Sequence, residues 1–310
     1  SGDPLPALSC GAVVVALLGH KKSLHKLLKR ISPKAFYSGI TLLLISVVVL
    51  PLLPDEGYGP WQALNPYWLW WMVVLISGLS FIGYLFTQLL GEKRGTLITA
   101  IAGGFASSTA VTLTMARFAK KNSHSVIYAS GMLLACSIMF PRVLIEVFVV
   151  NRELLTLLWP PILLMFAGLL TVIALMYRQH KRKPASETGE ITINNPLQLT
   201  TAIQFGILLA VILLLAEAMK DWFGDAGIYS LAIVSGLMDV DAITLSLSRS
   251  AQGELSGQVA AMGIILACAS NTLLKGVMFA SVAGIKLHYR YAVYMILSVI
   301  PGLLYGIWQF

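Results

Sequence analysis

Long apolar segments recur along this 310-residue chain, and they constrain its fold more than any other feature. Hydrophobic residues make up 57% of the sequence and charged residues only 12%, whereas a soluble domain carries about 25% charged residues. A run of roughly 18 or more apolar residues can cross a bilayer as a helix, which bonds all of its own backbone polar groups. The sequence therefore predicts an all-α integral membrane protein.

Eight segments have the length and apolar character of spanning helices. They are 5–19, 38–53, 67–90, 126–150, 155–177, 197–219, 257–282 and 290–308. Two further segments, 95–117 and 227–249, mix glycine and polar residues with apolar ones. Each of these two can either cross the membrane or enter it and return on the same side as a re-entrant hairpin.

The distribution of Lys and Arg distinguishes these alternatives, because cytoplasmic loops carry an excess of both residues. If both polar segments crossed, the two sides of the membrane would hold twelve and eight Lys/Arg residues. If both are re-entrant, seventeen fall on one side and only Arg152, Lys220 and Arg249 on the other. The strong asymmetry favours two re-entrant hairpins, with the basic run 19–34 on the anionic leaflet surface.

The two polar segments are copies of one another. Residues 95–136 align without a gap with residues 227–268, and 14 of the 42 positions are identical. The composition would give roughly three or four identities by chance, so the chain contains an internal duplication.

The duplication divides the chain into four parts. Residues 1–64 hold N-terminal spans and a basic interfacial segment, and 65–177 form a first repeat. Residues 178–195 form a polar cytoplasmic linker, and 196–310 form a second repeat. Each repeat contains three crossings and one hairpin, so the second repeat is inverted in the membrane, as in many secondary transporters.

The matching hairpins carry different polar residues. The first reads "GGFASSTAVTLTMAR", with Ser107, Ser108 and Thr109, and the second reads "SGLMDVDAITLSLSR", with Asp239 and Asp241. Carboxylate and hydroxyl oxygens suit hard cations such as Mg²⁺, so one interpretation is a bound metal cation. The other is N-capping of a half-helix, for which Asp241 and Thr109 are the expected caps.

Further polar residues lie within apolar segments. A neutral oxygen for the cation is expected from Asn271, and also from Ser270 and Thr272. Lys275 either neutralises an aspartate or alternates with a cation. We also assign to the substrate region two threonines at equivalent repeat positions, Thr112 and Thr244.

Two other pairs of residues have simpler explanations. Arg142 and Glu146 are four residues apart and are expected to pair on one helix face. Cys136 and Cys268 occupy equivalent repeat positions and are expected to be packing residues. No activated nucleophile or acid–base pair is evident, so we expect neither an enzyme nor a cofactor.

Seven stretches of the sequence resemble the C-terminal membrane domain of bacterial MgtC/SapB-family proteins. They are "SLHKLLKRIS", "VVLPLLPDEGYGPWQALNP", "VVLISGLSFIGY", "SSTAVTL", "FPRVLIE", "GLMDVDAITLSLSR" and "ASNTLLKG". The MgtC-type domain itself is not among these residues. The resemblance implies a multi-pass protein of the bacterial inner membrane with a role in magnesium homeostasis.

Three functions are compatible with these observations. The first is a secondary transporter of a cation, plausibly Mg²⁺ or a similar divalent metal, working by alternating access around a midplane site. The second is an anion or carboxylate transporter coupled to Na⁺ or H⁺, and the third is a regulatory membrane protein that transports nothing. The expected partners are the lipid bilayer and the transported ion, with no nucleic acid, and the sequence is compatible with a homodimer.

Overall fold

The structure is a computed structural model that describes residues 19, 21, 32–90, 96–121, 125–179, 199–253 and 255–310. Its α-helices in these ranges are α3 (Pro33–Val49), α4 (Pro66–Leu90), α5 (Thr96–Lys121), α6 (Ser125–Ser137), α7 (Met139–Val150), α8 (Arg152–Gln179), α9 (Leu199–Met238), α10 (Val240–Ser250), α11 (Gly257–Ala283) and α12 (Ile285–Gln309). The predicted span 5–19, most of the basic run 19–34 and nearly all of the linker 178–195 lie outside the described residues.

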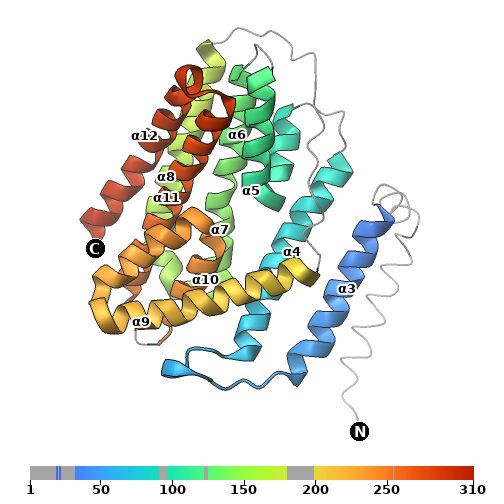
Figure 1. Cartoon of the computed structure of the whole chain (residues 1–310), viewed down its shortest axis with the longest axis vertical. Helices are drawn as coiled ribbons and strands as arrows, with labels where there is room; N and C mark the ends of the chain where they lie inside the picture. The colour runs from blue at the N-terminus through green and yellow to red at the C-terminus, as the bar shows by residue number, and fades with distance from the viewer. Residues whose placement is uncertain are drawn as a thin grey trace.

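Seven helical segments of the described chain are long and apolar enough to cross a bilayer, so this is a multi-pass membrane protein. Every predicted span from residue 38 onward falls on a helix, and 126–150 falls on the consecutive helices α6 and α7. The shorter helix α3 is apolar as well and lies alongside α4 (Figure 1).

Helix α5 is a hairpin. Its backbone is extended at Ser107 (φ −164°, ψ 98°), in the middle of the helix. Ala100, before this break, and Met115, after it, both lie against Gly131 of α6. Two residues on opposite sides of the break can meet the same position of α6 only if the chain reverses direction. Both ends of α5 therefore lie at the same end of the bundle, the upper end in Figure 1.

The second hairpin repeats this packing 132 residues later. The end of α9 and helix α10 are separated by Asp239, whose backbone is extended (φ −155°, ψ 123°). Ala232 and Leu247, the equivalents of Ala100 and Met115, both lie against Gly263 of α11. This hairpin starts and ends at the lower end of the bundle, so that the two tips approach each other near the middle (Figure 1).

Both hairpins approach their neighbouring helix closely at an equivalent glycine. A Cβ at Gly104 would lie 2.8 Å from the backbone of Ala135 in α6. A Cβ at Gly236 would lie 2.5 Å from the carbonyl oxygen of Ala267 in α11. Since no side chain fits in either space, glycine lets the hairpins come this near to the helices that support them.

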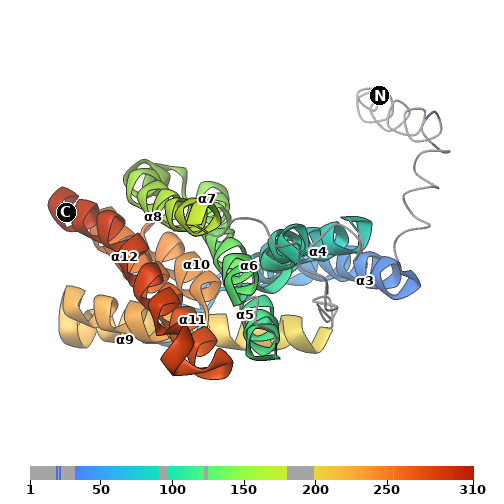
Figure 2. The ribbon, with the colours of Figure 1, turned by 90° about the horizontal axis from the view of Figure 1, so that it is seen from above.

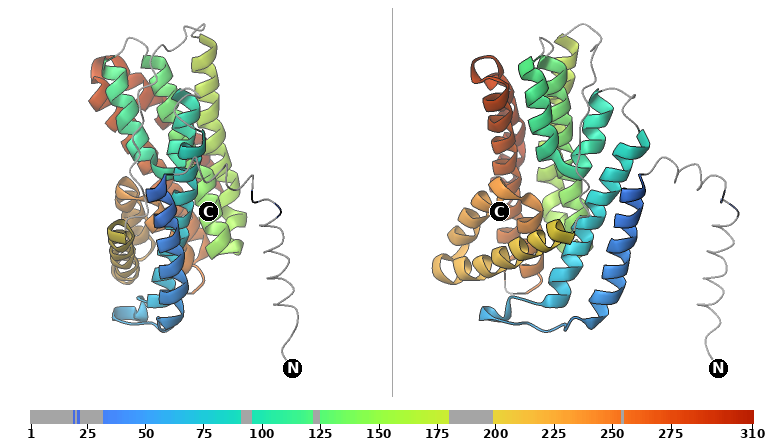
Figure 3. Two further views of the ribbon diagram at one scale, coloured as in Figure 1. Left: turned by 90° about the vertical axis from the view of Figure 1, so that its right-hand side faces the viewer. Right: turned by 45° about the vertical axis from the view of Figure 1, so that its right-hand side comes forward.

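Helix α9 has a second bend, at Gly224, where φ is 59°. The part before Gly224 contains the predicted span 197–219, and it lies across the bundle instead of along it (Figures 1 and 2). Its equivalent in the first half, α4, runs along the bundle. Helices α8, α11 and α12 pack together, on the side away from α3 in Figure 1 and in the right-hand view of Figure 3.

Candidate functional site

A cavity of about 480 Å³ lies where the two hairpin tips meet. Helices α4, α5, α7, α9, α10 and α11 all contribute to its wall, and we call it the tip cavity. Its polar and charged lining residues are Ser77, Ser80, Ser107, Ser108, Thr109, Arg142, Thr201, Asp239, Asp241, Asn271 and Lys275. The structure thus brings together seven of the residues that the sequence assigned to a site.

Each tip residue with extended backbone caps the half-helix that follows it. The Asp239 Oδ1 atom accepts hydrogen bonds from the backbone N–H groups of Asp241 (2.7 Å) and Ala242 (3.3 Å). The Ser107 Oγ atom accepts one from the N–H group of Ala110 (3.3 Å). The expectation that Asp241 and Thr109 are the caps is wrong, because both helix breaks fall two residues earlier.

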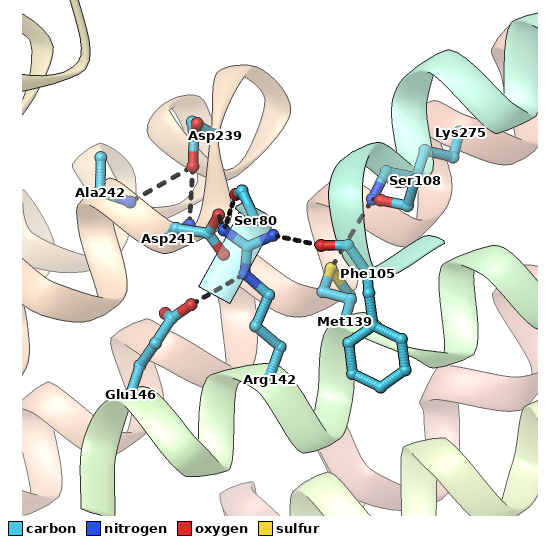
Figure 4. A network of polar contacts seen from close by, with 10 residues as sticks. All are labelled: Ser80, Phe105, Ser108, Met139, Arg142, Glu146, Asp239, Asp241, Ala242 and Lys275. Carbon is cyan, nitrogen blue, oxygen red and sulfur yellow. Dashed lines mark hydrogen bonds and ion pairs between the residues drawn. The ribbon is translucent and has the colours of Figure 1, made fainter. Parts of the chain in front are cut away.

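The second tip is acidic, and we call Asp239, Asp241 and the neighbouring Glu146 the acid tip. Arg142 of α7 holds it in place (Figure 4). One guanidinium nitrogen lies 2.6 Å from Asp241 Oδ2, and Nε lies 3.1 Å from Glu146 Oε1. The predicted pairing of Arg142 with Glu146 is confirmed.

Arg142 also ties the acid tip to the first half of the chain. It donates hydrogen bonds to the carbonyl oxygen of Phe105 (3.2 Å) and to Ser80 Oγ (3.3 Å). Its contact with Asp241 was not anticipated from the sequence. The one indication of this contact in the sequence was Arg142 itself, because an arginine within a membrane helix is rare and usually has a partner.

The first tip carries hydroxyl groups, and we call Ser107, Ser108 and Thr109 the hydroxyl tip. Lys275 of α11 donates a hydrogen bond to Ser108 Oγ over 2.7 Å, and its Nζ atom lies 3.9 Å from Met139 Sδ. The expectation that Lys275 pairs with an aspartate is wrong for the described residues, where the acid tip's ion pairs are those with Arg142. Lys275 points instead to α5, against which α11 packs directly (Figure 4).

Asn271 of α11 also lines the tip cavity. Its side-chain nitrogen donates a hydrogen bond to the carbonyl oxygen of Gly236 (2.6 Å). Its Oδ1 atom is buried and has no hydrogen-bond partner among the described residues. The amide therefore anchors the second hairpin to α11 and leaves one acceptor unused.

The other four predicted site residues are not part of the cavity lining. Ser270, Thr272 and Thr112 donate hydrogen bonds to backbone carbonyl groups of Ala267, Cys268 and Ser108, respectively. Thr244 is fully buried, and its hydroxyl has no partner among the described residues. These residues line helix contacts, so the structure does not bring them to the site.

The charges in the tip cavity are unevenly distributed. The hydroxyl tip has the ammonium group of Lys275 and the N-terminus of a half-helix, and both favour an anion. The acid tip has three carboxyl groups around one guanidinium group. In the described part of the chain, no cluster of three or more His, Cys, Asp or Glu side chains is placed to hold a metal ion.

Comparison with known proteins identifies two similarities. The family model described as "Domain of unknown function (DUF4010)" matches residues 74–283. An "Uncharacterized protein" of Aquifex aeolicus (strain VF5) is 38% identical over 189 residues, which cover 59% of this chain and 82% of that protein. No solved structure matches. Neither match names the MgtC/SapB family, so that resemblance stays a prediction.

Proposed function

Because the chain belongs to the DUF4010 family, whose function is unknown, we propose a function from the site: a secondary transporter of a small anion. The anion binds in the tip cavity at the hydroxyl tip, and the acid tip holds the charge that couples its movement to a cation gradient. Carboxylates, phosphate and sulfate are the anions whose oxygens match hydroxyl, ammonium and backbone N–H donors.

The observation that carries this proposal is the hydrogen bond between Lys275 and Ser108. Lys275 is 4% exposed, lines the cavity and places its ammonium group at the start of a half-helix. An anion at this position would meet a side-chain cation, up to three hydroxyl groups and the positive end of a helix dipole. A charge in the membrane interior is costly. A lysine that faces a cavity and has no carboxylate partner among the described residues therefore favours binding of an external anion.

The arrangement of the hairpins supports alternating access as the mechanism. The same contacts recur 132 residues apart at Gly131 and Gly263, and the two hairpins point in opposite directions along the bundle (Figure 1). We interpret them as inverted repeats whose relative motion opens the cavity to one side at a time. The expected location is the cytoplasmic membrane of a bacterium.

The test is thermal stability of the purified protein against a panel of anions and cations. The panel contains acetate, succinate, citrate, phosphate and sulfate as salts of one inert cation, and Na⁺, Mg²⁺ and Mn²⁺ as salts of one inert anion. We expect one class of anion to raise the melting temperature. Lys275→Met should weaken this binding about 10–100-fold, because it removes a charge-assisted hydrogen bond.

Lys286→Met is the matched control, because Lys286 starts α12 at the exposed end of the bundle. It should leave the anion effect unchanged. The proposal fails if no anion stabilises the wild-type protein, or if Lys275→Met and Lys286→Met bind the anion equally well.

A cation as the transported ion is the second candidate. Its specific support is the unused Oδ1 atom of Asn271, a residue that lines the tip cavity together with Asp239 and Asp241. In this case Mg²⁺ or Mn²⁺ should stabilise the protein, and Asp241→Asn should abolish the effect while Lys275→Met preserves it. Stabilisation by neither anion nor cation would favour the regulatory function.

A further inference from the structure

Glu146 has an unusual environment for a carboxyl group. Its side chain is fully buried at 0% exposure, and it does not line the tip cavity. Its Oε1 atom accepts a hydrogen bond from Arg142, whereas its Oε2 atom has no hydrogen-bond partner among the described residues. A buried carboxylate oxygen without a donor is costly, because nothing replaces the water that it loses.

The nearest ionisable group outside α7 is another carboxyl group. The carboxyl groups of Glu146 and Asp241 both contact the guanidinium group of Arg142, which brings them close to each other (Figure 4). Two carboxylates at this distance repel each other, whereas a single proton between them turns the repulsion into a hydrogen bond. The Oε2 atom of Glu146 can carry such a proton, because Oε1 already accepts a hydrogen bond from Arg142.

Among the described residues, Arg142 is the positively charged group that contacts both carboxyl groups. A third carboxyl group, that of Asp239 in the acid tip, also interacts electrostatically with the guanidinium group of Arg142. Cys268 is the ionisable side chain that α11 brings towards Glu146. The basic side chains of α5 lie near its end at Lys120. Helix α6 contributes Cys136 and Tyr128. Helix α8 carries its charged residues near its two ends.

We propose that Glu146 and Asp241 bind one exchangeable proton between them, and that this proton is the coupling ion for the anion at the hydroxyl tip. The role of this proton as the coupling ion rests on the proposed function, whereas the sharing of the proton does not. A proton binds to one carboxylate, which becomes a carboxylic acid and donates a hydrogen bond to the other. No bond other than the O–H bond forms or breaks.

The geometry also provides a path for the proton. The Asp241 side chain is 18% exposed and lines the tip cavity, so a proton can reach it from whichever side the cavity faces. Glu146, behind it, is closed off from the cavity and receives the proton through Asp241. One proton cancels the charge of a singly charged anion and one of the charges of a doubly charged anion, which lowers the cost of moving the loaded cavity through the membrane.

Infrared spectroscopy of the purified full chain tests the proton site without requiring any substrate. A protonated carboxyl group has a C=O stretching band that a carboxylate lacks. We expect such a band near neutral pH in the wild-type protein. It should be lost in Glu146→Gln, moved in Asp241→Asn, and retained in Glu153→Gln, which changes an exposed glutamate at the start of α8.

Two results would overturn the proton site: no protonated-carboxyl band in the wild-type protein, or an unchanged band in both Glu146→Gln and Asp241→Asn. If Glu146→Gln does not fold, Asp241→Asn provides the second variant. Asp241 is partly exposed, and the asparagine amide oxygen can still accept a hydrogen bond from Arg142.

A second experiment tests the coupling. Proteoliposomes that contain a pH-sensitive dye receive succinate, phosphate or sulfate in a sodium-free medium. Acidification of the interior by one of these anions, lost in Glu146→Gln and kept in Glu153→Gln, is the expected result. If an anion enters only with Na⁺, the coupling proposal is overturned. If no anion enters or binds, the proposed function fails, and the infrared result still decides whether the proton site exists.

Discussion

The two hairpin tips have the same backbone and opposite chemistry. Ser107 and Asp239 occupy equivalent positions, both are extended, and both cap the half-helix that follows. The hydroxyl tip nevertheless contacts an ammonium group, whereas the acid tip surrounds a guanidinium group with carboxylates. After duplication, the backbone geometry was therefore kept while the two tips became specialised for different charges.

The two cations that contact the tips cross over between the halves of the chain. Arg142 belongs to the first half and pairs with Asp241 of the second, while Lys275 belongs to the second half and bonds to Ser108 of the first. Each tip thus receives its cation from the opposite half of the chain. A relative movement of the halves would break or remake both contacts, which connects the charge state of the tips with the state of the cavity.

The directions of the two hairpins give the largest expected contrast, because labelling from one side of a membrane is nearly all-or-none. In a variant lacking Cys10, we introduce Lys120→Cys at the base of the first hairpin and Gly253→Cys at the base of the second. A membrane-impermeant thiol reagent should label them from opposite sides. Cys136 and Cys268 are fully buried and should not react. Labelling of both positions from the same side would contradict opposed hairpins.

Arg142→Gln should have the next largest effect. It leaves the fully buried Glu146 and the partly exposed Asp241 without their shared cation. Removal of one partner from a buried ion pair costs about 3–5 kcal/mol. Thermal unfolding in detergent measures the loss. The double variant Arg142→Gln with Asp241→Asn should recover part of it, since one of the uncompensated charges is then absent. Equal stability of the single and double variants would argue against this pairing.

The close approaches at Gly104 and Gly236 should be equally sensitive to a methyl group. Gly104→Ala and Gly236→Ala should each reduce stability by about 1–3 kcal/mol, because backbone atoms of the supporting helix must move. Gly78→Ala in α4 is the control, since a Cβ there meets no atom within 4 Å. A loss at one glycine and not at the other would show that the two hairpins are supported differently.

The smallest expected change distinguishes capping from charge at the hydroxyl tip. Ser107→Ala should cost about 1 kcal/mol, because an N-cap acceptor is lost. Ser107→Asp keeps the acceptor and should keep the stability, but it adds a carboxylate to the hydroxyl tip next to Ser108. Anion stabilisation should then disappear while the melting temperature without anion stays near that of the wild-type protein. Undiminished anion binding by Ser107→Asp would contradict an anion site at this tip.

Much of the fold could be predicted from the sequence, since apolar length and the repeat are local properties of the chain. The described parts of the predicted spans from residue 38 onward fall almost entirely on helices. The reversal of the chain within α5 is compatible with the hairpin that the charge distribution favoured. The crosswise course of the first part of α9 could not be predicted. Its apolar pattern is compatible with either orientation, and the bend at Gly224 determines its direction.

The candidate site was only partly predictable. The duplication pointed to both tips, and seven of the proposed residues do line one cavity. The partner of Lys275 was assigned incorrectly and the contact of Arg142 with Asp241 was missed, because both depend on how α7 and α11 pack against the hairpins. Lys275 therefore meets Ser108, and Arg142 meets Asp241, although the sequence suggested an aspartate for Lys275. The cap positions were missed by two residues, because only the backbone shows where each helix breaks.

Counterflow in proteoliposomes tests the central claim most directly. Vesicles that contain the wild-type protein are loaded with the anion that stabilises it most, and uptake of a radiolabelled trace of the same anion is followed. We predict transient accumulation of the label by the wild-type and Lys286→Met proteins, and its loss in Lys275→Met. Equal accumulation with Lys275→Met, or none with the wild-type protein, would contradict an anion transporter whose binding site is the hydroxyl tip.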